Sequence, residues 1–271
     1  MDFINIFIGF FQIIKLDFEN FIIIFNSIPV ILTWIVFLLS CFVCILIFLR
    51  MFGEIGLYIY SAIAVIAANI QVLKLVKFSF FSEPIALGTI LFASTFLCTD
   101  ILAEYYGVKS ARKNILISFS GFLLMTFFML FTLGFDPLDK IEAGNDYMWA
   151  LNTQNNLLGI FLPFPIFFIA SMIAYLISQF FDVWFFEKIS KITKKKFLWF
   201  RNNISTMLSS LLDNIIFSLL AWIILNPNPL DFNIVLFTFI LGTYILRIFI
   251  ALVDTPFVYI AKYIIPNNKN E

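Results

Sequence analysis

The chain contains no histidine, and this absence excludes several kinds of site together. Histidine-based catalytic triads, histidine proton relays and histidine-ligated metal sites all require an imidazole. Cysteine is scarce as well, with Cys41, Cys44 and Cys98 only. Cys41 and Cys44 form a C-x-x-C pattern inside an apolar run, where cysteine is usually a small packing residue. We therefore expect no metal site and no cofactor.

Charge is also low and evenly balanced. Charged residues make up 13% of the chain, and Lys plus Arg equal Asp plus Glu at 17 each. No broad basic field is present, so no nucleic-acid partner is expected. The chain has no Gly-x-x-x-x-Gly-Lys loop, so any ATP-driven step must be supplied by another chain. The chain is 62% apolar and includes 38 phenylalanines, which is typical of a polytopic protein surrounded by membrane lipid.

Apolar runs of helix length divide the chain. A bilayer core about 30 Å thick needs roughly 20 helical residues. This length predicts an all-α membrane helical bundle of about seven transmembrane helices. The predicted spans are Val30–Leu49, Gly56–Val72, Ile85–Tyr106, Ile115–Leu133, Leu157–Phe186, Asn203–Leu225 and Phe232–Ile264. Pro163 and Pro165 are expected to kink the outer part of the fifth span.

The N-terminal region differs from the rest. Phe3–Ile14 is apolar but too short to cross a bilayer, so residues 1–28 are predicted to form an interfacial segment. Residues 29–271 are then one transmembrane domain. The chain starts Met1-Asp2-Phe3 without a cationic stretch, so no cleaved signal peptide is expected.

The distribution of cations predicts the orientation. The densest basic loop spans residues 188–201, and with this loop inside, most of the 17 cations lie on the cytoplasmic side. Seven spans then satisfy the positive-inside rule with the N-terminus outside and the C-terminus in the cytoplasm.

Polar residues recur on one face of several predicted spans, at steps of three or four. These stripes are Tyr175, Ser178, Gln179 and Asp182; Asn202, Thr206, Ser209 and Asp213; and Thr243, Arg247 and Asp254. The third span adds Asp100 and Glu104, one turn apart. An ionised Asp at a membrane helix centre costs roughly 2.5 to 3.5 kcal/mol, so such groups usually face a bundle interior or a watery cavity.

Depth separates these groups further. At about 1.5 Å per residue, Asp100 and Asp182 lie about 10 Å beneath the cytoplasmic surface. Asp213, Arg247 and Asp254 are expected nearer the middle of the membrane. Simpler interpretations stay open: the small polar residues pack helices together, Arg247 forms an internal ion pair with Asp254 or a facing Asp, and the acids of the third span only reach the surface.

Four blocks of the sequence resemble the queuosine precursor transporter family. They are Thr99–Lys113 (TDILAEYYGVKSARK, preceded by GTILF at Gly88–Phe92), Tyr175–Phe186 (YLISQFFDVWFF), Leu198–Phe217 (LWFRNNISTMLSSLLDNIIF) and Ala251–Tyr259 (ALVDTPFVY). The resemblance covers about residues 67–264. It implies an inner-membrane importer, not an enzyme, for 7-deazaguanines such as the cyano or aminomethyl compound or queuine. It also implies a six-helix core similar to the substrate-binding subunits of energy-coupling vitamin transporters, with the first span as an extra helix. Asn214 and Arg247 stand where the family pattern has Thr and Lys.

The substrate's chemistry suggests roles for these residues. A deazaguanine carries two adjacent N–H donors on one edge, which a carboxylate accepts as a bidentate pair. We expect Asp213 or Asp182 to take this edge, with hydrogen bonds from Gln179 and Asn202. Phe180, Tyr175 or Trp199 is expected to stack on the ring. Asp100 or Glu104 meets an ammonium on the substrate or carries a coupling proton, and Arg247 and Asp254 complete the polar cavity.

Three alternatives stay open at this point. The solute is another nucleobase or a vitamin; or the chain is the substrate-binding subunit of a transporter energised by a partner; or two buried aspartates form an intramembrane hydrolase. The chain lacks the Gly-x-Gly-Asp surroundings of such hydrolases, which disfavours the last. The preferred precursor, the coupling mechanism and the oligomeric state stay open.

Overall fold

The fold is a bundle of long apolar helices. The computed structural model describes residues 2–79, 84–161 and 164–266. Within these ranges six helices are long and apolar enough to cross a membrane. They are α3 (Val30–Phe52), α4 (Glu54–Gln71), α6 (Val108–Leu133), α9 (Phe164–Ile192), α10 (Leu198–Leu219) with the π-helical η3 (Leu220–Ile224), and the continuous helix from α11 to α12. The predicted polytopic helical membrane bundle is therefore confirmed.

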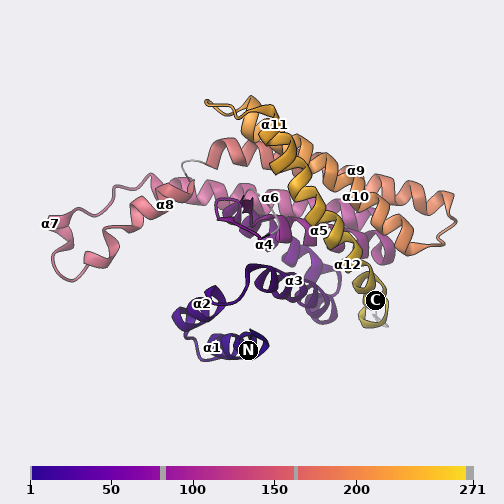
Figure 1. The fold of residues 1–271 in the computed structure, drawn as a ribbon, viewed down its shortest axis with the longest axis horizontal. Helices are drawn as coiled ribbons and strands as arrows, with labels where there is room; N and C mark the ends of the chain where they lie inside the picture. The colour runs from indigo at the N-terminus through magenta and orange to yellow at the C-terminus, as the bar shows by residue number, and fades with distance from the viewer. Residues whose placement is uncertain (1, 80–83, 162–163, 267–271) are drawn as a thin grey trace.

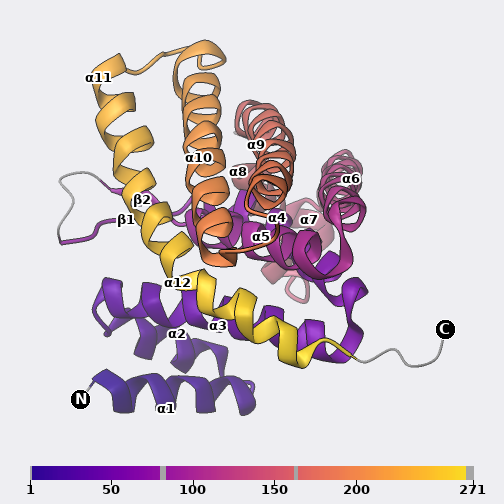
Figure 2. The ribbon, with the colours of Figure 1, turned by 90° about the vertical axis from the view of Figure 1, so that its right-hand side faces the viewer.

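The third predicted span is a shorter helix at the centre of the bundle. Helix α5 (Thr89–Ile101) continues as the π-helical η1 (Leu102–Tyr106), and all residues of α5 except Phe92 are buried. It packs against α3, α4, α6, α9, α10 and α12. Figures 1 and 2 show α5 among these helices. Its polar residues are therefore held away from lipid.

The predicted start of that span at Ile85 is wrong. Strand β1 (Leu75–Val76) pairs antiparallel with β2 (Ile85–Ala86), so Ile85 lies opposite Val76 in a short hairpin ahead of the helix. Gly88 then brings the chain against the end of α4, because a Cβ there would lie 2.6 Å from the carbonyl oxygen of Ala68. The chain thus enters α5 through a close backbone contact.

The ends of several helices meet on one side. Gly53 joins α3 to α4 and Gly107 joins η1 to α6, both with positive φ, a conformation that glycine adopts without strain. On the same side Arg112 of α6 lies 3.9 Å from Glu187 of α9. The segment with α7 (Lys140–Ala143), η2 (Met148–Ala150) and α8 (Thr153–Phe161) extends far from the turn that joins α9 to α10 (Figure 1).

The last long helix runs from α11 (Phe232–Ile234) through the π-helical η4 (Val235–Gly242) to α12 (Thr243–Ile264). Figure 2 shows α12 changing direction along its length. Pro256 lies inside α12 and cannot donate the usual backbone hydrogen bond, which accounts for a bend. Pro165, in contrast, lies in the first turn of α9, where a missing N–H does not kink a helix. Pro163 lies outside the described residues.

Residues ahead of the bundle form a helical hairpin. Helix α1 (Asp2–Ile14) packs on α2 (Phe18–Asn26), with the Phe10 and Phe25 rings 5.7 Å apart. Asp17 caps α2, and the hydrogen bonds from Asn20 hold the pKa of its carboxyl below the ordinary value. Figure 2 shows the pair lying beside α3. Phe7 is 78% exposed, as on a lipid-facing surface, and the interfacial assignment of residues 1–28 stays a prediction.

Candidate functional site

Helix α10 carries the polar residues around which the site is built. Every buried residue of α10 is polar or charged: Arg201, Asn202, Asn203, Ser205, Thr206, Ser209, Ser210, Asp213, Asn214 and Ser218. Burying unpaired polar groups is costly, so such a face needs partners on neighbouring helices. The partners come from α5, α9 and α12, and they form two separate centres.

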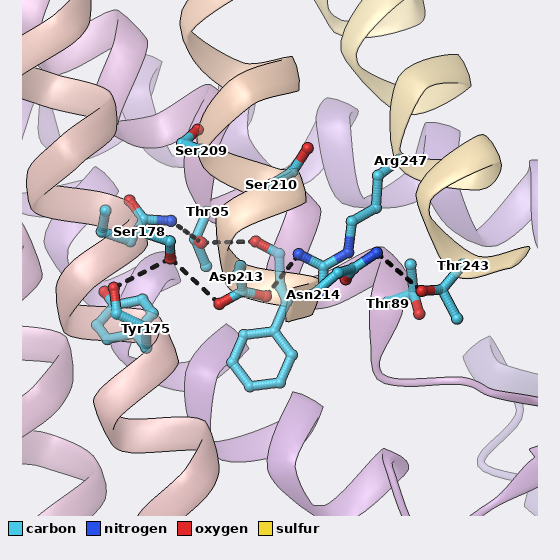
Figure 3. A network of polar contacts seen from close by, with 12 residues as sticks. Thr89, Thr95, Tyr175, Ser178, Ser209, Ser210, Asp213, Asn214, Thr243 and Arg247 are labelled. Carbon is cyan, nitrogen blue, oxygen red and sulfur yellow. Dashed lines mark hydrogen bonds and ion pairs between the residues drawn. The ribbon is translucent and has the colours of Figure 1, made fainter. Parts of the chain in front are cut away.

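The first centre is an ion pair between α10 and α12. Arg247 Nη1 lies 2.6 Å from Asp213 Oδ2, and both side chains are about nine-tenths buried. Asp213 Oδ1 accepts a hydrogen bond of 3.1 Å from Ser178 of α9. Figure 3 shows the Asp213 carboxylate between Ser178 and Arg247. The predicted ion pair of Arg247 is therefore with the facing Asp213 and not with Asp254.

A pocket opens beside this ion pair and encloses about 570 Å³, its open mouth included. Its lining combines Val72, Ala86, Thr89, Phe92, Ser171, Ala174, Asp213, Asn214, Phe217, Ser218, Trp222, Phe239, Thr243 and Arg247. Trp222 of η3 stacks on Phe239 of η4 with ring centroids 4.6 Å apart. Two π-helical segments, which often occur at functional sites, thus supply one aromatic wall.

Three polar groups of the lining have no hydrogen-bond partner within the described ranges. They are Trp222 Nε1, Arg247 Nε and Ser171 Oγ. The first two are N–H donors, and buried donors are rarely left unpaired. Among the described residues, Asp213 accepts hydrogen bonds from Ser178 and Arg247, while its oxygens offer about four lone-pair positions. The pocket therefore offers unused donors beside an unused acceptor, as a site for a polar ligand would.

The second centre lies nearer the N-terminal end of α10 and contains three carboxylates. Asp100, Asp182 and Asp254 come from α5, α9 and α12, and none has solvent exposure. Thr206 donates to Asp100 Oδ2 at 3.1 Å and Ser209 to Asp182 Oδ1 at 2.8 Å. The interpretation that Asp100 only reaches the surface is therefore wrong.

Asparagines connect the third carboxylate to α10. The Asn202 amide donates to Asp254 Oδ1 at 2.9 Å, and Asn203 donates to the Thr255 hydroxyl at 2.7 Å. Asp254 lies seven residues beyond Arg247, which corresponds to about 10 Å along α12, and so it does not join the ion pair of Arg247 and Asp213. Asp254 belongs to the acidic centre instead.

Glu104 and Arg201 form an ion pair at the end of this polar path. Arg201 is completely buried although it is always charged, and its guanidinium lies 5.3 Å from the Phe186 ring centroid. Glu104 therefore pairs with a cation of α10. It does not face the pocket.

Among the other predicted site residues, Gln179 and Tyr175 lie beside the pocket without lining it. The Gln179 amide donates to Thr95 at 2.9 Å and accepts from Thr99 at 3.2 Å, linking α9 to α5. The backbone oxygen of Tyr175 accepts from Ser178, the residue that reaches Asp213. Asp213 and Arg247 are the predicted residues that line the pocket.

The aromatic predictions miss the pocket. Trp199 is 52% exposed at the start of α10, and Phe180 packs on the hydrophobic core. The sequence contained a signal for two missed lining residues, because Asn214 follows Asp213 and Thr243 shares the stripe of Arg247. In the structure these two join, with Asn214 donating to Thr243 at 2.8 Å. The aromatic wall of Trp222 and Phe239 carries no comparable signal.

Comparison with known proteins identifies the family of the chain. Residues 86–261 match the family described as "Putative vitamin uptake transporter". The chain belongs to this family. A "Probable queuosine precursor transporter" of Bacillus subtilis (strain 168) is 33% identical over 237 residues, which cover 87% of this chain and 96% of that protein. No solved structure matches the chain. This member of the vitamin uptake transporter family is thus a multi-pass membrane protein of a family whose members take small molecules as substrates.

Proposed function

We propose that the chain imports queuosine precursors, which are 7-deazaguanine bases, across the inner membrane. The 33% identical relative named as a probable transporter of these compounds supports this substrate class. The chain acts as a transporter and not as an enzyme, with its N-terminus outside and its C-terminus in the cytoplasm. A basic loop beside the Arg201 end of α10 supports that orientation.

The observation that carries the proposal is the Asp213 and Arg247 pair at the pocket. A guanine-like edge places a carbonyl acceptor beside two N–H donors. The carboxylate of Asp213 accepts from the donors, and Arg247 Nε or Trp222 Nε1 donates to the carbonyl. Asp213 and Arg247 both line the pocket. The N–H groups at Arg247 Nε and Trp222 Nε1 lack a partner within the described residues. The unused groups of the pocket are therefore complementary to this edge.

Aromatic side chains support recognition of a flat ring. Phe92, Phe217, Trp222 and Phe239 line the same pocket as Asp213. Stacking of a base on such a side chain contributes about 1 to 3 kcal/mol in nucleic-acid-binding proteins. A planar heterocycle between these rings gains this contribution while its polar edge meets the ion pair.

Complementation tests the function. The chain is expressed in a bacterium that neither makes deazaguanines nor imports them, each precursor is supplied at low concentration, and queuosine in tRNA is measured. We expect one or more precursors to restore queuosine, and Asp213→Ala to abolish the effect at equal membrane expression. Restoration that survives Asp213→Ala contradicts the role of this carboxylate. No restoration by any precursor contradicts the substrate class and favours another nucleobase or a vitamin.

A substitution in the aromatic wall tests the pocket itself. Trp222→Phe keeps a stacking ring and removes the unpaired N–H. We expect the affinity to fall about two- to tenfold, because one hydrogen bond contributes about 0.5 to 1.5 kcal/mol. Trp184→Phe is the matched control, since Trp184 is 46% exposed on α9 and outside the pocket. Equal uptake constants for the two variants would argue against ligand contact at Trp222.

A further inference from the structure

We propose that Asp100 and Asp182 together hold one shared proton, and that this proton is the ion that drives import. The shared proton is a property of the chain alone, whereas its role in driving import rests on the proposed function. The site is separate from the substrate pocket, whose lining includes neither residue.

The geometry of the two carboxyl groups leaves one oxygen of each free. Thr206 satisfies Asp100 Oδ2 and Ser209 satisfies Asp182 Oδ1. Asp100 Oδ1 and Asp182 Oδ2 have no hydrogen-bond donor within the described part of the chain. The two side chains nevertheless lie close enough to interact directly. Two neighbouring buried carboxyl groups, each with one oxygen that lacks a donor, are satisfied when one of the two carries a proton.

The charge around the pair leads to the same conclusion. The titratable groups near the pair are Cys98 of α5, Glu104 of η1 and Asp254 of α12. Arg201 is engaged by Glu104, as Arg247 is by Asp213, and no ion pair between described residues reaches Asp100, Asp182 or Asp254. Two adjacent carboxylates in a low dielectric cannot both ionise without compensation. One shared proton halves the negative charge of the pair.

An independent observation comes from Asn202. Its side chain is fully buried and donates through Nδ2 to Asp254 Oδ1, yet its own Oδ1 has no partner among the described residues. Asp254 Oδ2 is unpartnered in the same way. The acidic centre thus contains several buried acceptor atoms without a partner among the described residues, so whatever satisfies them carries positive charge or donates hydrogen bonds.

Among cations, the proton fits this arrangement best. The described residues contain no group of three or more His, Cys, Asp or Glu side chains placed to hold a metal ion. A bound proton needs only the two carboxyl groups of Asp100 and Asp182, each of which also accepts a hydrogen bond, from Thr206 and Ser209 respectively. The proton enters on a carboxylate oxygen to give a carboxyl group, and it leaves to cytoplasmic water to restore the carboxylate.

The position of the pair suits coupling to the pocket. Ser178 reaches Asp213 while Asp182, four residues further along α9, is in the acidic centre. Ser209 and Asp213 are likewise four residues apart on α10, which corresponds to about 6 Å. A substrate that changes the hydrogen bonds of Asp213 therefore acts on the two helices that hold the proton site.

Infrared spectroscopy of the purified full chain tests the proton without any substrate. We expect a carboxyl C=O band at neutral pH that shifts in D2O, disappears in Asp100→Asn and in Asp182→Asn, and persists in the control Asp213→Asn. Thr206→Val keeps both acids and removes one donor, so it should shift the band even if the Asn variants fail to fold. A wild-type protein without a protonated carboxyl band overturns the proposal.

Transport in proteoliposomes tests the coupling, with labelled aminomethyl-deazaguanine as the probe. An inward proton gradient should drive accumulation, and Asp182→Asn should lose accumulation while keeping exchange of internal for external probe. Accumulation driven by a sodium gradient alone overturns the proposal. If the wild type shows neither uptake nor exchange, the proposed function is contradicted, and the infrared result still decides the proton site.

Discussion

At the scale of single residues, the effect of the buried ion pair of Asp213 and Arg247 on stability depends on whether one charge or both charges are removed. Arg247 and Asp213 are buried together, and loss of one partner leaves the other charge uncompensated. Breaking a buried pair in this way costs about 3 to 5 kcal/mol, whereas removing both charges costs much less. A pair of this kind therefore adds little net stability.

This relation predicts a non-additive double substitution. Asp213→Asn and Arg247→Gln should each lower the thermal unfolding midpoint in detergent, and the double variant should recover part of the loss, with a coupling of about 1 to 3 kcal/mol. The control pair is Glu187 and Lys191, whose side chains are 29% and 74% exposed. Its coupling should stay below about 1 kcal/mol. Strictly additive losses at Asp213 and Arg247 would contradict the buried ion pair.

Individual residues of the site were predictable to different degrees. Asp213 and Arg247 stand out because a charge within an apolar helix is costly and therefore conspicuous. Trp222 and Phe239 do not, because an aromatic residue that lines a pocket has the same local sequence as one that faces lipid. The partner of Arg247 was not predictable either. Asp254 lies in the same stripe of α12, and only the packing of α10 shows that Arg247 pairs with Asp213.

At the scale of elements, close packing of turns determines how the helices join. Gly56, in the first turn of α4, lies against the end of α3, where a Cβ would fall 2.1 Å from the carbonyl oxygen of Phe48. No side chain can approach a backbone oxygen so closely. The α3 and α4 connection therefore requires glycine at this position.

Gly56→Ala should accordingly reduce the yield of folded protein and lower its unfolding midpoint, because either α3 or α4 must shift. Gly121→Ala is the matched control: its Cβ would meet the Ala62 Cβ at an ordinary 3.6 Å in the middle of α6. Gel filtration and thermal unfolding of both variants in detergent measure the difference. Equal behaviour of the two variants would show that the turn adapts at little cost.

Hydropathy predicted the long helices because lipid exposure demands a continuous apolar run. It failed at Ile85, where a short apolar strand precedes α5, since hydropathy does not distinguish a strand from the first turn of a helix. The π-helical segments η3 and η4 were not predictable either, because the extra residue in a turn leaves no mark in the apolar pattern. Their aromatic residues form part of the pocket wall.

At the scale of the whole molecule, the two ends of the bundle differ in charge. The loop between α9 and α10 carries several lysines, whereas the segment between α6 and α8 includes Asp136, Asp139, Glu142 and Asp146. The positive-inside rule predicts that the first lies in the cytoplasm and the second outside.

Cysteine labelling tests this orientation. In a variant without Cys41, Cys44 and Cys98, which all lie in helices, Asn145→Cys and Lys195→Cys place single thiols on the two exposed ends. A membrane-impermeant maleimide added to intact cells should label residue 145 and should label residue 195 only after the membrane is opened. The reverse pattern would invert the orientation.

One helix carries one partner of nearly every polar contact described above. Along its length α10 binds Glu104, Asp254, Asp100, Asp182 and Arg247, in that order, through Arg201, Asn202, Thr206, Ser209 and Asp213. Because these partners lie along one face of α10, rotation of the helix about its own axis breaks all of these contacts in the same movement. Rotation of α10 would therefore switch the pocket, the acidic centre and the terminal ion pair as one cooperative unit.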